Sequence, residues 1–274
     1  MDIKNTLLEV TQKLQNKSPT SNLDSELLLM TALRVSRTYL YTYGERILSA
    51  SEKQTLDDLC KRRINLEPMA YIIGTKEFWS REFDVSSATL IPRPETEMLV
   101  DEVLKLSTLD KSISILEMGT GSGAIAISLA LERPRTSIVA TDISSEALDL
   151  AKRNAKKFNA NNIIFQNSDW FRELKKQKFD LIVSNPPYIE SHDNCLLDLK
   201  FEPISALVSG EDGLDAIRHI AKNAKQFLKI DGTLLIEHGK DQEKAVNQIF
   251  KSNQWGKIKC LTDLRGFPRI TVAK

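Results

Sequence analysis

The chain has 274 residues, and its 38 Lys and Arg nearly balance 37 Asp and Glu, giving a formal net charge of +1. This length allows one large domain, or a medium domain with a small one. The near-neutral charge argues against a dedicated nucleic-acid-binding protein, whose surface is usually strongly basic. The N-terminus lacks the basic and then apolar order of a signal peptide, and no run of about 18 apolar residues occurs, so we expect a cytoplasmic protein.

The cysteines and histidines give no sign of a metal site. The three cysteines lie far apart along the chain and lack the spacing of metal ligands, and the histidines are not predicted to form a site with them. These residues are Cys60, Cys195, Cys260, His192, His219 and His238. We therefore expect reduced thiols and no bound metal.

Residues 1–67 are predicted to be helical, because apolar side chains recur at helical spacing. The two clearest stripes are Ile3, Leu7, Val10 and Leu14, and Leu23, Leu27, Met30 and Leu33. Ser51 is the expected N-cap of a third helix, which ends at Pro68. The segment contains no clustered polar chemistry, so we expect a small domain that recognises a protein partner or packs on a larger domain.

Residues 68–91 are predicted to form a β-hairpin linker, since residues 71–74 and the aromatic segment 76–85 have the composition of strands. A helix is expected from Pro94, because proline suits the first helical turn and the acids Glu95 and Glu97 suit the positive end of the helix dipole. Arg93 lies between two prolines, which makes it a candidate ligand contact.

Strands and helices alternate from residue 112. This predicts an α/β domain over residues 92–274, with a doubly wound, mostly parallel seven-stranded sheet. Strands are expected near 113–118, 137–141, 163–167, 179–184, 232–237, 257–261 and 268–273. Helices are expected near 122–132, 145–158, 214–229 and 241–252. The short turn at 265–268 predicts that the last two strands are antiparallel.

A glycine-rich turn follows the first of these strands. The turn consists of Gly119, Thr120, Gly121, Ser122 and Gly123. It precedes a helix whose N-terminus would face a bound ligand. Asp142 follows the next strand, where a carboxylate can accept from both ribose hydroxyls. This order predicts an adenosine-containing cofactor.

The glycine spacing indicates which cofactor binds. The dinucleotide pattern is Gly-x-Gly-x-x-Gly, whereas this chain has Gly-x-Gly-x-Gly with Glu117 just before it. A negative charge there is unfavourable for a pyrophosphate and suits the ammonium group of S-adenosylmethionine. After the third strand, Asp169 is expected to accept from the adenine amino group and Trp170 to cover the adenine face. Packing of Trp170 in the core is the alternative.

Asn185, Pro186, Pro187 and Tyr188 follow the apolar strand near 179–184. The prolines end the strand and hold a rigid turn at the carboxyl edge of the sheet, where ligands bind in open α/β sheets. The Asn185 side-chain oxygen and the Pro186 carbonyl are predicted to accept the two hydrogens of a planar NH2 group, with Tyr188 against its π face. A plain turn at the end of a strand is the alternative.

Together these motifs resemble the class I S-adenosylmethionine-dependent methyltransferases, and more specifically the release factor glutamine methyltransferase family. The specific resemblance rests on residues 91–97, 117–123, 185–188, 201–203 and 206–207. It implies a helical N-terminal domain that binds the substrate, and methylation of the glutamine side-chain nitrogen in the Gly-Gly-Gln loop of peptide-chain release factors. It also implies that Gly119 to Gly123 line the methionine end of the cofactor, while Asp142 holds the ribose and Trp170 the adenine. Residues 185–188 would bind the target amide. The enzyme would be a monomer with no stable nucleic-acid partner and no membrane partner.

Three other functions fit parts of the sequence. An N-methyltransferase acting on a nucleic-acid base would meet the same planar NH2 group, but it needs a basic channel. A nicotinamide-dependent oxidoreductase is disfavoured by the glycine spacing, and a non-catalytic binding module by the presence of both motifs. No strong general base lies beside residues 185–188, so Glu202 and His238 are the candidate proton acceptors, each with a structural role as the alternative.

Overall fold

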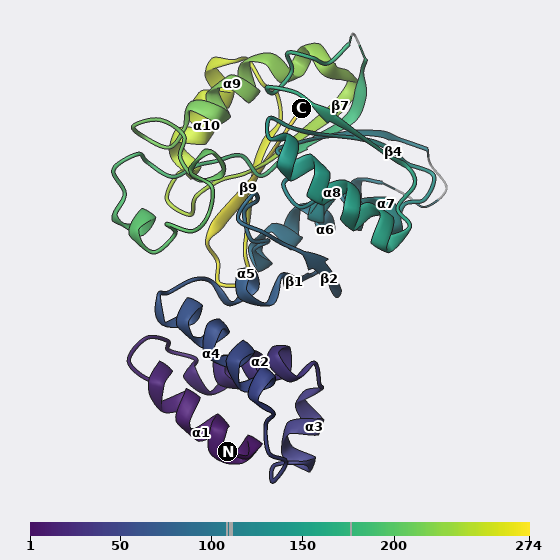
Figure 1. Cartoon of the computed structure of the whole chain (residues 1–274). Helices are drawn as coiled ribbons and strands as arrows, with labels where there is room; N and C mark the ends of the chain where they lie inside the picture. Colours follow the sequence, from purple (N-terminus) through teal and green to yellow (C-terminus); the bar gives the residue numbers. More distant parts are fainter. Residues whose placement is uncertain (108, 110–111, 176) are drawn as a thin grey trace. The chain divides into compact units, whose positions relative to one another are not determined.

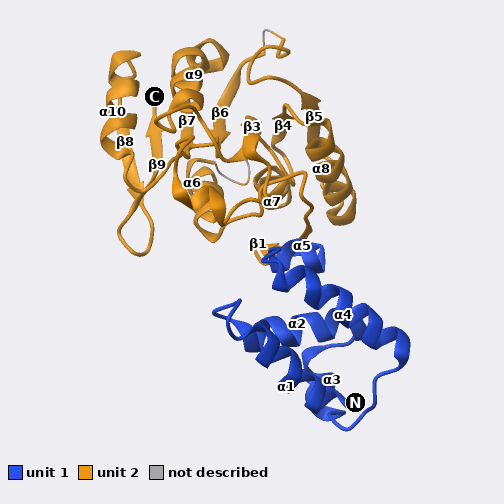
Figure 2. Ribbon diagram, turned by 60° about the vertical axis from the view of Figure 1, so that its left-hand side comes forward, with its two compact units in different colours: residues 1–75 blue, residues 76–274 orange. Residues whose placement is uncertain are grey.

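The computed structural model describes residues 1–107, 109, 112–175 and 177–274. The chain divides into two compact units, residues 1–75 and residues 76–274, which Figure 2 shows in blue and orange. Each unit contains a hydrophobic core made of its own residues.

The first unit is helical, as predicted for residues 1–67. Its helices are α1 (Ile3–Leu14), α2 (Ser21–Leu33), α3 (Arg37–Thr42), α4 (Ala50–Ile64) and α5 (Met69–Ile73). The N-cap of α4 is Ser49 and not Ser51, because Ser49 and Glu52 form a reciprocal capping box. The Ser49 hydroxyl accepts from the Glu52 amide at 3.2 Å, and the Glu52 carboxylate accepts from the Ser49 amide at 2.8 Å. Two amides at the helix start are thereby satisfied.

The buried face of α2 differs from the predicted stripe. Leu23 is 47% exposed, whereas Leu28 and Leu29 are fully buried. Asp24 is buried beside them, because the Arg63 guanidinium on α4 donates to its carboxylate at 2.7 Å. The spacing predicted the helix correctly, but this ion pair is one of the contacts that determine which side of it faces the core.

Residues 69–73 form α5, so the strand expected at residues 71–74 is wrong. Gly74 ends this helix with a left-handed φ of 86°. The hairpin is confined to β1 (Thr75–Phe78) and β2 (Arg81–Asp84), which form a two-stranded sheet. Phe78 and Phe83 of the hairpin are buried in a core of the second unit.

The second unit is built on a seven-stranded sheet with the order β5-β4-β3-β6-β7-β9-β8. Its strands are β3 (Ser114–Met118), β4 (Ser137–Asp142), β5 (Ile163–Asn167), β6 (Phe179–Ser184), β7 (Leu228–Glu237), β8 (Ile258–Thr262) and β9 (Pro268–Ala273). The five strands from β3 to β7 pair in parallel, and β9 is antiparallel to both of its neighbours. The predicted mostly parallel sheet and its antiparallel last pair are confirmed.

Helices cover both faces of this sheet (Figures 1 and 2). The helices on one face are α6 (Glu97–Leu106), α7 (Ala124–Glu132) and α8 (Ser145–Phe158), and those on the other are α9 (Asp215–Asn223) and α10 (Glu243–Ser252). The short 3-10 helices are η1 (Pro94–Thr96), η2 (Asn194–Leu197), η3 (Ile204–Ala206) and η4 (Ala224–Phe227). Successive residues of a strand point to opposite faces of the sheet. Ile115 therefore lies in the core on one face, and Leu116 lies in the core on the other. Because both faces are covered, the central strands are apolar over most of their length, and Glu117 of β3 is a buried exception.

β7 begins at Leu228 and not near 232, and the helix predicted over 214–229 ends at Asn223, before η4. Phe179 pairs with Leu228 but Leu181 pairs with Thr233, so β7 contains extra residues opposite β6. Asp231 takes a positive φ of 65° within this irregularity. The bulge interrupts the apolar pattern, which explains why the sequence alone placed the strand start too late.

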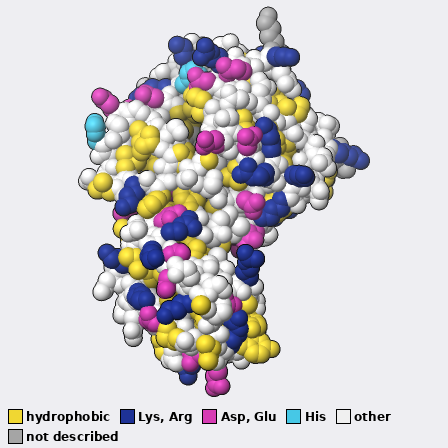
Figure 3. Space-filling view, viewed as in Figure 1, with side chains coloured by type: hydrophobic (Ala, Val, Ile, Leu, Met, Phe, Trp, Pro, Cys, Tyr) yellow, Lys and Arg dark blue, Asp and Glu magenta, His cyan; other side chains and the backbone are white. Residues whose placement is uncertain are grey.

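The surface carries both signs of charge. On the face shown in Figure 3, Lys and Arg side chains are interspersed with Asp and Glu. Within the described ranges, no helix has the length and apolar character needed to cross a membrane. Over the same ranges, no three His, Cys, Asp or Glu residues are grouped as a metal site would require.

Gly123→Ala should lower the free energy of unfolding by about 2–4 kcal/mol. Gly123 has a φ of 83°, and a Cβ there would lie 2.8 Å from Ile127 Cδ1 and 3.2 Å from Ala151 Cβ, between α7 and α8. Gly266→Ala is the matched control, since Gly266 also has a φ of 83° but, among the described residues beyond its own chain neighbours, no heavy atom within 4 Å of its Cβ position. The control should lose only about 1 kcal/mol from backbone strain. Urea unfolding followed by circular dichroism measures both, and equal losses would contradict a packing role for Gly123.

Candidate active site

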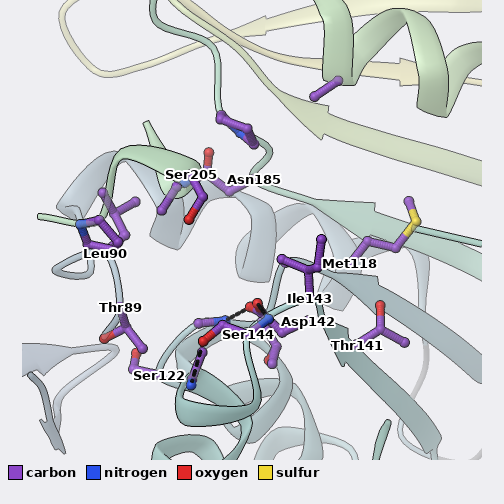
Figure 4. Close-up of a pocket in the computed structure, with 18 of the residues that line it drawn as sticks. Thr89, Leu90, Met118, Ser122, Thr141, Asp142, Ile143, Ser144, Asn185 and Ser205 are labelled. Carbon is purple, nitrogen blue, oxygen red and sulfur yellow. Dashed lines mark hydrogen bonds between the residues drawn. The ribbon is translucent and has the colours of Figure 1, made fainter. Parts of the chain in front are cut away.

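A cavity of about 600 Å³ opens at the carboxyl edge of the sheet, within the second unit. Its walls come from the segment before α6, the glycine turn after β3, the ends of β4 and β5, and the residues after β6. The strand order reverses between β3 and β6, and ligands of open α/β sheets bind at such a reversal. In Figure 4, Asn185 and Ser205 lie across the cavity from Asp142 and Ser144.

The glycine turn is fastened to β4. The backbone amides of Gly119 and Thr120 both donate to the Thr141 carbonyl, each at 2.9 Å. Of the predicted cofactor residues in this turn, Gly119, Thr120, Gly121 and Ser122 line the cavity. Gly123 does not line it, because this glycine occupies the contact between α7 and α8.

Asp142 lies at the cavity wall with its orientation fixed by the backbone. Its Oδ2 accepts from the Gly121 amide and its Oδ1 from the Ser144 amide, both at 2.9 Å. Burial raises the pKa of Asp142, and the backbone hydrogen bonds oppose that rise. Each oxygen keeps lone-pair capacity toward the cavity, so the carboxylate can accept from the two hydroxyls of a ribose.

Glu117 lies beneath the turn and does not line the cavity. Its side chain is almost fully buried and its Oε2 accepts from the Thr120 hydroxyl at 2.7 Å. Within the described part of the chain, Glu117 Oε1 has no hydrogen-bond partner. Burial raises the pKa of Glu117 to about 7, and the negative charge of Asp142 adds to the rise. The structure therefore gives Glu117 a place behind the turn, not beside a bound ammonium group.

Asp169 and Trp170 both line the cavity. Trp170 also packs against the core on the α9 face, as the alternative interpretation expected, and its contact with adenine stays a prediction. Its ring centroid lies 6.2 Å from that of His219 on α9, which borders the same end of the cavity. No motif pointed to His219 from the sequence alone, because a single histidine on a helix has no pattern around it.

Some residues of the turn after β6 line the cavity, and others lie in the protein interior. Asn185 and Pro187 line the cavity, and the Asn185 amide donates from Nδ2 to Thr96 Oγ1 at 3.0 Å. Pro186 is buried, and the Tyr188 hydroxyl donates to Glu237 Oε1 at 3.5 Å. Burial raises the pKa of the Tyr188 hydroxyl. Contact between Tyr188 and a substrate amide stays a prediction.

Arg93 and Glu202 are paired with each other. Arg93 borders the cavity, but its guanidinium donates to Glu202 Oε1, while the Ile91 amide donates to Glu202 Oε2 at 2.9 Å. Both carboxylate oxygens are thus used to join the segment before α6 to the segment before η3. Glu202 has a structural role in this pairing.

His238 is fully buried away from the cavity. Its Nδ1 lies 3.0 Å from the Gly239 carbonyl and its Nε2 lies 3.1 Å from the Thr271 hydroxyl. Burial lowers the pKa of His238. Since both ring nitrogens have protein partners, the structure gives His238 a structural role as well.

The fold and this cavity define a class I methyltransferase. A family model described as a methyltransferase domain matches residues 109–264, and one described as the PrmC N-terminal domain matches residues 5–74. The methyltransferase from Pyrococcus furiosus has a similar fold, with a TM-score of 0.55 at 16% identity over 79% of this chain and 98% of that chain.

Two full-length relatives are more informative. The release factor glutamine methyltransferase of Coxiella burnetii is 43% identical over 274 residues, covering 100% of this chain and 99% of the relative. That of Salmonella typhimurium is 42% identical over 276 residues, covering 100% and 99%. The chain belongs to the release factor glutamine methyltransferase family.

The cavity residues fit the S-adenosylmethionine that this class uses. The volume of about 600 Å³ lies within the range of sites for small molecules. Asp142 would hold the ribose, Asp169 and Trp170 the adenine, and the turn 119–122 the methionine end.

Asp142→Ala should weaken S-adenosylmethionine binding about tenfold to a hundredfold, because the ribose would lose a charged acceptor. Asp149→Ala is the control, since Asp149 is an exposed acid on α8 that pairs with the neighbouring Lys152 at 3.2 Å. Calorimetric titration should find the control unchanged. Equal affinity in Asp142→Ala would contradict the placement of the ribose.

Proposed function

We propose that the protein transfers a methyl group from S-adenosylmethionine to the side-chain amide nitrogen of the glutamine in the Gly-Gly-Gln motif of peptide-chain release factors. The observation that carries this proposal is the orientation of Asn185. Its NH2 group donates to Thr96 at 3.0 Å, so its side-chain oxygen is the atom left to accept at the cavity wall. The names of the full-length relatives support release factors as the substrate.

The chemistry required of the chain is mainly orientation. S-adenosylmethionine supplies a methyl group that its sulfonium already activates. A glutamine amide is a weak nucleophile, because its nitrogen lone pair is delocalised into the carbonyl. The Asn185 oxygen would accept one N–H and the Pro186 carbonyl the other, which aligns the nitrogen. Both acceptors would stabilise the positive charge that develops there in the transition state.

The proton released by the amide does not need a dedicated base. Glu202 is committed to Arg93 and the Ile91 amide, and His238 is fully buried and does not line the cavity. A protonated amide is strongly acidic, so water at the mouth of the cavity can accept the proton. Neither residue is therefore assigned a role in proton transfer.

Methylation of a nucleic-acid base is the nearest alternative, because a base also presents a planar NH2 group. Such an enzyme needs a basic channel that holds the phosphate backbone. The overall charge of +1 and the interspersed charges of Figure 3 do not favour it. The predicted monomer and the predicted cytoplasmic location stay part of this proposal.

Mass spectrometry of a release factor after incubation with the protein and S-adenosylmethionine tests the proposed function. One added methyl group on the glutamine of the Gly-Gly-Gln motif is expected. An unmodified release factor, incubated with folded protein that binds the cofactor, would contradict it.

Asn185→Ala should lower turnover by about a hundredfold or more, the scale for losing one preorganised polar contact in a transition state. S-adenosylmethionine affinity should stay nearly unchanged. Asn185→Asp is the matched variant, because it keeps an acceptor but loses the NH2 group that donates to Thr96. Partial activity would indicate an acceptor-only role, and no activity would show that the NH2 group is needed. Wild-type turnover by Asn185→Ala, assayed with radiolabelled cofactor, would remove this turn from the mechanism.

We also propose that the first unit recognises the release factor. It exposes large apolar side chains, including Leu8 on α1, Tyr41 on α3 and Ile47 between α3 and α4, which are 57%, 65% and 71% exposed. Deleting residues 1–67 should abolish methylation of an intact release factor while leaving S-adenosylmethionine binding in the second unit. Calorimetry and thermal melting would confirm that the shortened protein is folded. Normal methylation by that protein would refute the recognition role.

A further inference from the structure

The loop between β8 and β9 extends past the edge of the sheet at which the cavity opens. Glu237, the last residue of β7, pairs with Ile270 of β9. Because β9 is antiparallel to β7, the residues that precede Ile270 continue beyond the carboxyl end of β7. Residues 263–267 connect β8 to β9 there, and Figure 2 shows their loop reaching beyond the ends of both strands.

Asp263 holds this loop in one conformation. Its Oδ1 accepts from the backbone amides of Arg265 and Phe267, both at 2.9 Å. Its Oδ2 accepts from Arg269 Nε at 3.2 Å, and its own amide donates to the Phe267 carbonyl at 2.8 Å. A loop that is ordered before binding loses little conformational entropy when a partner contacts it.

The ordered loop exposes apolar side chains. Leu264 is fully exposed and Phe267 is 41% exposed. The Lys240 ammonium group and the Arg265 guanidinium lie over the Phe267 ring, each 5.6 Å from its centroid. Aromatic and arginine side chains are enriched where proteins bind each other. The composition of the loop therefore fits a surface that contacts another protein.

Two ion pairs join this loop to the wall of the cavity. The Arg265 guanidinium donates to Glu95 Oε1 at 2.9 Å. Two residues before Glu95, the Arg93 guanidinium donates to Glu202, whose side chain is only 2% exposed. Arg93 also lines the cavity. The β8–β9 loop, the segment before α6 and the segment before η3 are thereby connected along one side of the cavity.

The segment before η3 leads to another exposed apolar side chain. Ile204, the first residue of η3, is 60% exposed, and its neighbours Pro203 and Ser205 both line the cavity. Apolar side chains are thus exposed on two of the three connected segments. The rim surface is defined here as Ile204, Leu264, Arg265 and Phe267.

We propose that the rim surface binds the folded domain of the release factor that carries the Gly-Gly-Gln loop, through an apolar patch bordered by acidic side chains. A protein that places a glutamine amide at Asn185 must cover the mouth of the cavity, and the rim surface is joined to the wall of that cavity. The Lys240 and Arg265 side chains remain 53% and 63% exposed, which favours acidic groups around the apolar contact.

This inference rests on the proposed function and deepens it. The first unit is already proposed to recognise the release factor, and the rim surface adds a contact on the second unit. That contact would hold the domain beside the target glutamine, so its loss should weaken substrate binding and leave the chemical step unchanged.

Leu264→Asp tests the apolar contact. The side chain is fully exposed, so its replacement should leave the fold intact. The KM for an intact release factor should rise about tenfold or more, because a charged group would have to be buried against the partner. The kcat at saturating release factor and the affinity for S-adenosylmethionine should stay within about twofold of the wild-type values.

Ile230→Asp is the matched control. Ile230 is 96% exposed near the amino end of β7, at the opposite edge of the sheet from the cavity. Its substitution should leave the KM unchanged, and thermal melting should show both variants folded as the wild type is. A wild-type KM in Leu264→Asp, or an equal rise in Ile230→Asp, would overturn the proposal.

Binding can also be measured without methyl transfer. Calorimetric titration of a release factor into the protein, with the demethylated cofactor S-adenosylhomocysteine present, should show about tenfold weaker affinity in Leu264→Asp than in the wild type. That difference without any methylation would contradict only the proposed function. Methylation by the wild type with equal affinities in both proteins would contradict only the rim surface, and a wild type that binds no release factor would contradict both.

A second copy of this chain is the other occupant that the experiment can detect. Light scattering should find Leu264→Asp and the wild type in the same oligomeric state. A wild-type dimer that Leu264→Asp dissociates would assign the rim surface to self-association and would overturn the proposal.

Discussion

The parallel pairing of β3 with β6 determines the geometry of the whole site. Met118 and Ser184 are opposite each other in this pair, and the Ser184 hydroxyl donates to the Met118 carbonyl at 2.8 Å. The residues that follow, Gly119 and Asn185, therefore leave the sheet side by side, and a Cβ at Gly119 would lie 3.9 Å from the Asn185 carbonyl. A shift of this register by one residue would turn the apolar side chains of β6 to the opposite face. The same core that stabilises the sheet thus sets the distance between the cofactor turn and the amide-binding turn.

Two acids lie at the carboxyl edge of the sheet, where their burial disfavours the charged form of each side chain. Glu117 lies next to the glycine turn, and Glu237 lies next to the turn that contains Asn185. Burial raises the pKa of each carboxyl group to about 7. Because the folded pKa lies above the usual value of 4.5, their contribution to stability is fully present at low pH. It is lost as the pH rises through about 7. Buried acids with displaced pKa values are typical of functional sites, where charge is retained for its effect on a ligand or a neighbour.

Loops from distant parts of the sequence complete the cavity. The segment before α6 and the segment before η3 are joined by Glu202, which binds both Arg93 and the Ile91 amide. Arg93 is held rigidly between its prolines, as the sequence indicated, but its charge is neutralised within the protein.

The sequence by itself determined the class of fold, the order of most elements and the two motifs at the cavity, because each depends on local spacing, turn chemistry or a short run of residues. It placed Asp142, Asp169, Trp170 and Asn185 correctly at one edge of the sheet, since parallel strands bring their carboxyl ends together. Only the tertiary structure decided which side of α2 is buried, where the bulge in β7 falls, and that Gly123 packs helices and lies outside the cavity wall. It alone brought Thr96 to the Asn185 side-chain amide, which donates to the Thr96 hydroxyl at 3.0 Å. These features depend on contacts between residues far apart in the chain, and such contacts leave no periodic or local signal in a single sequence.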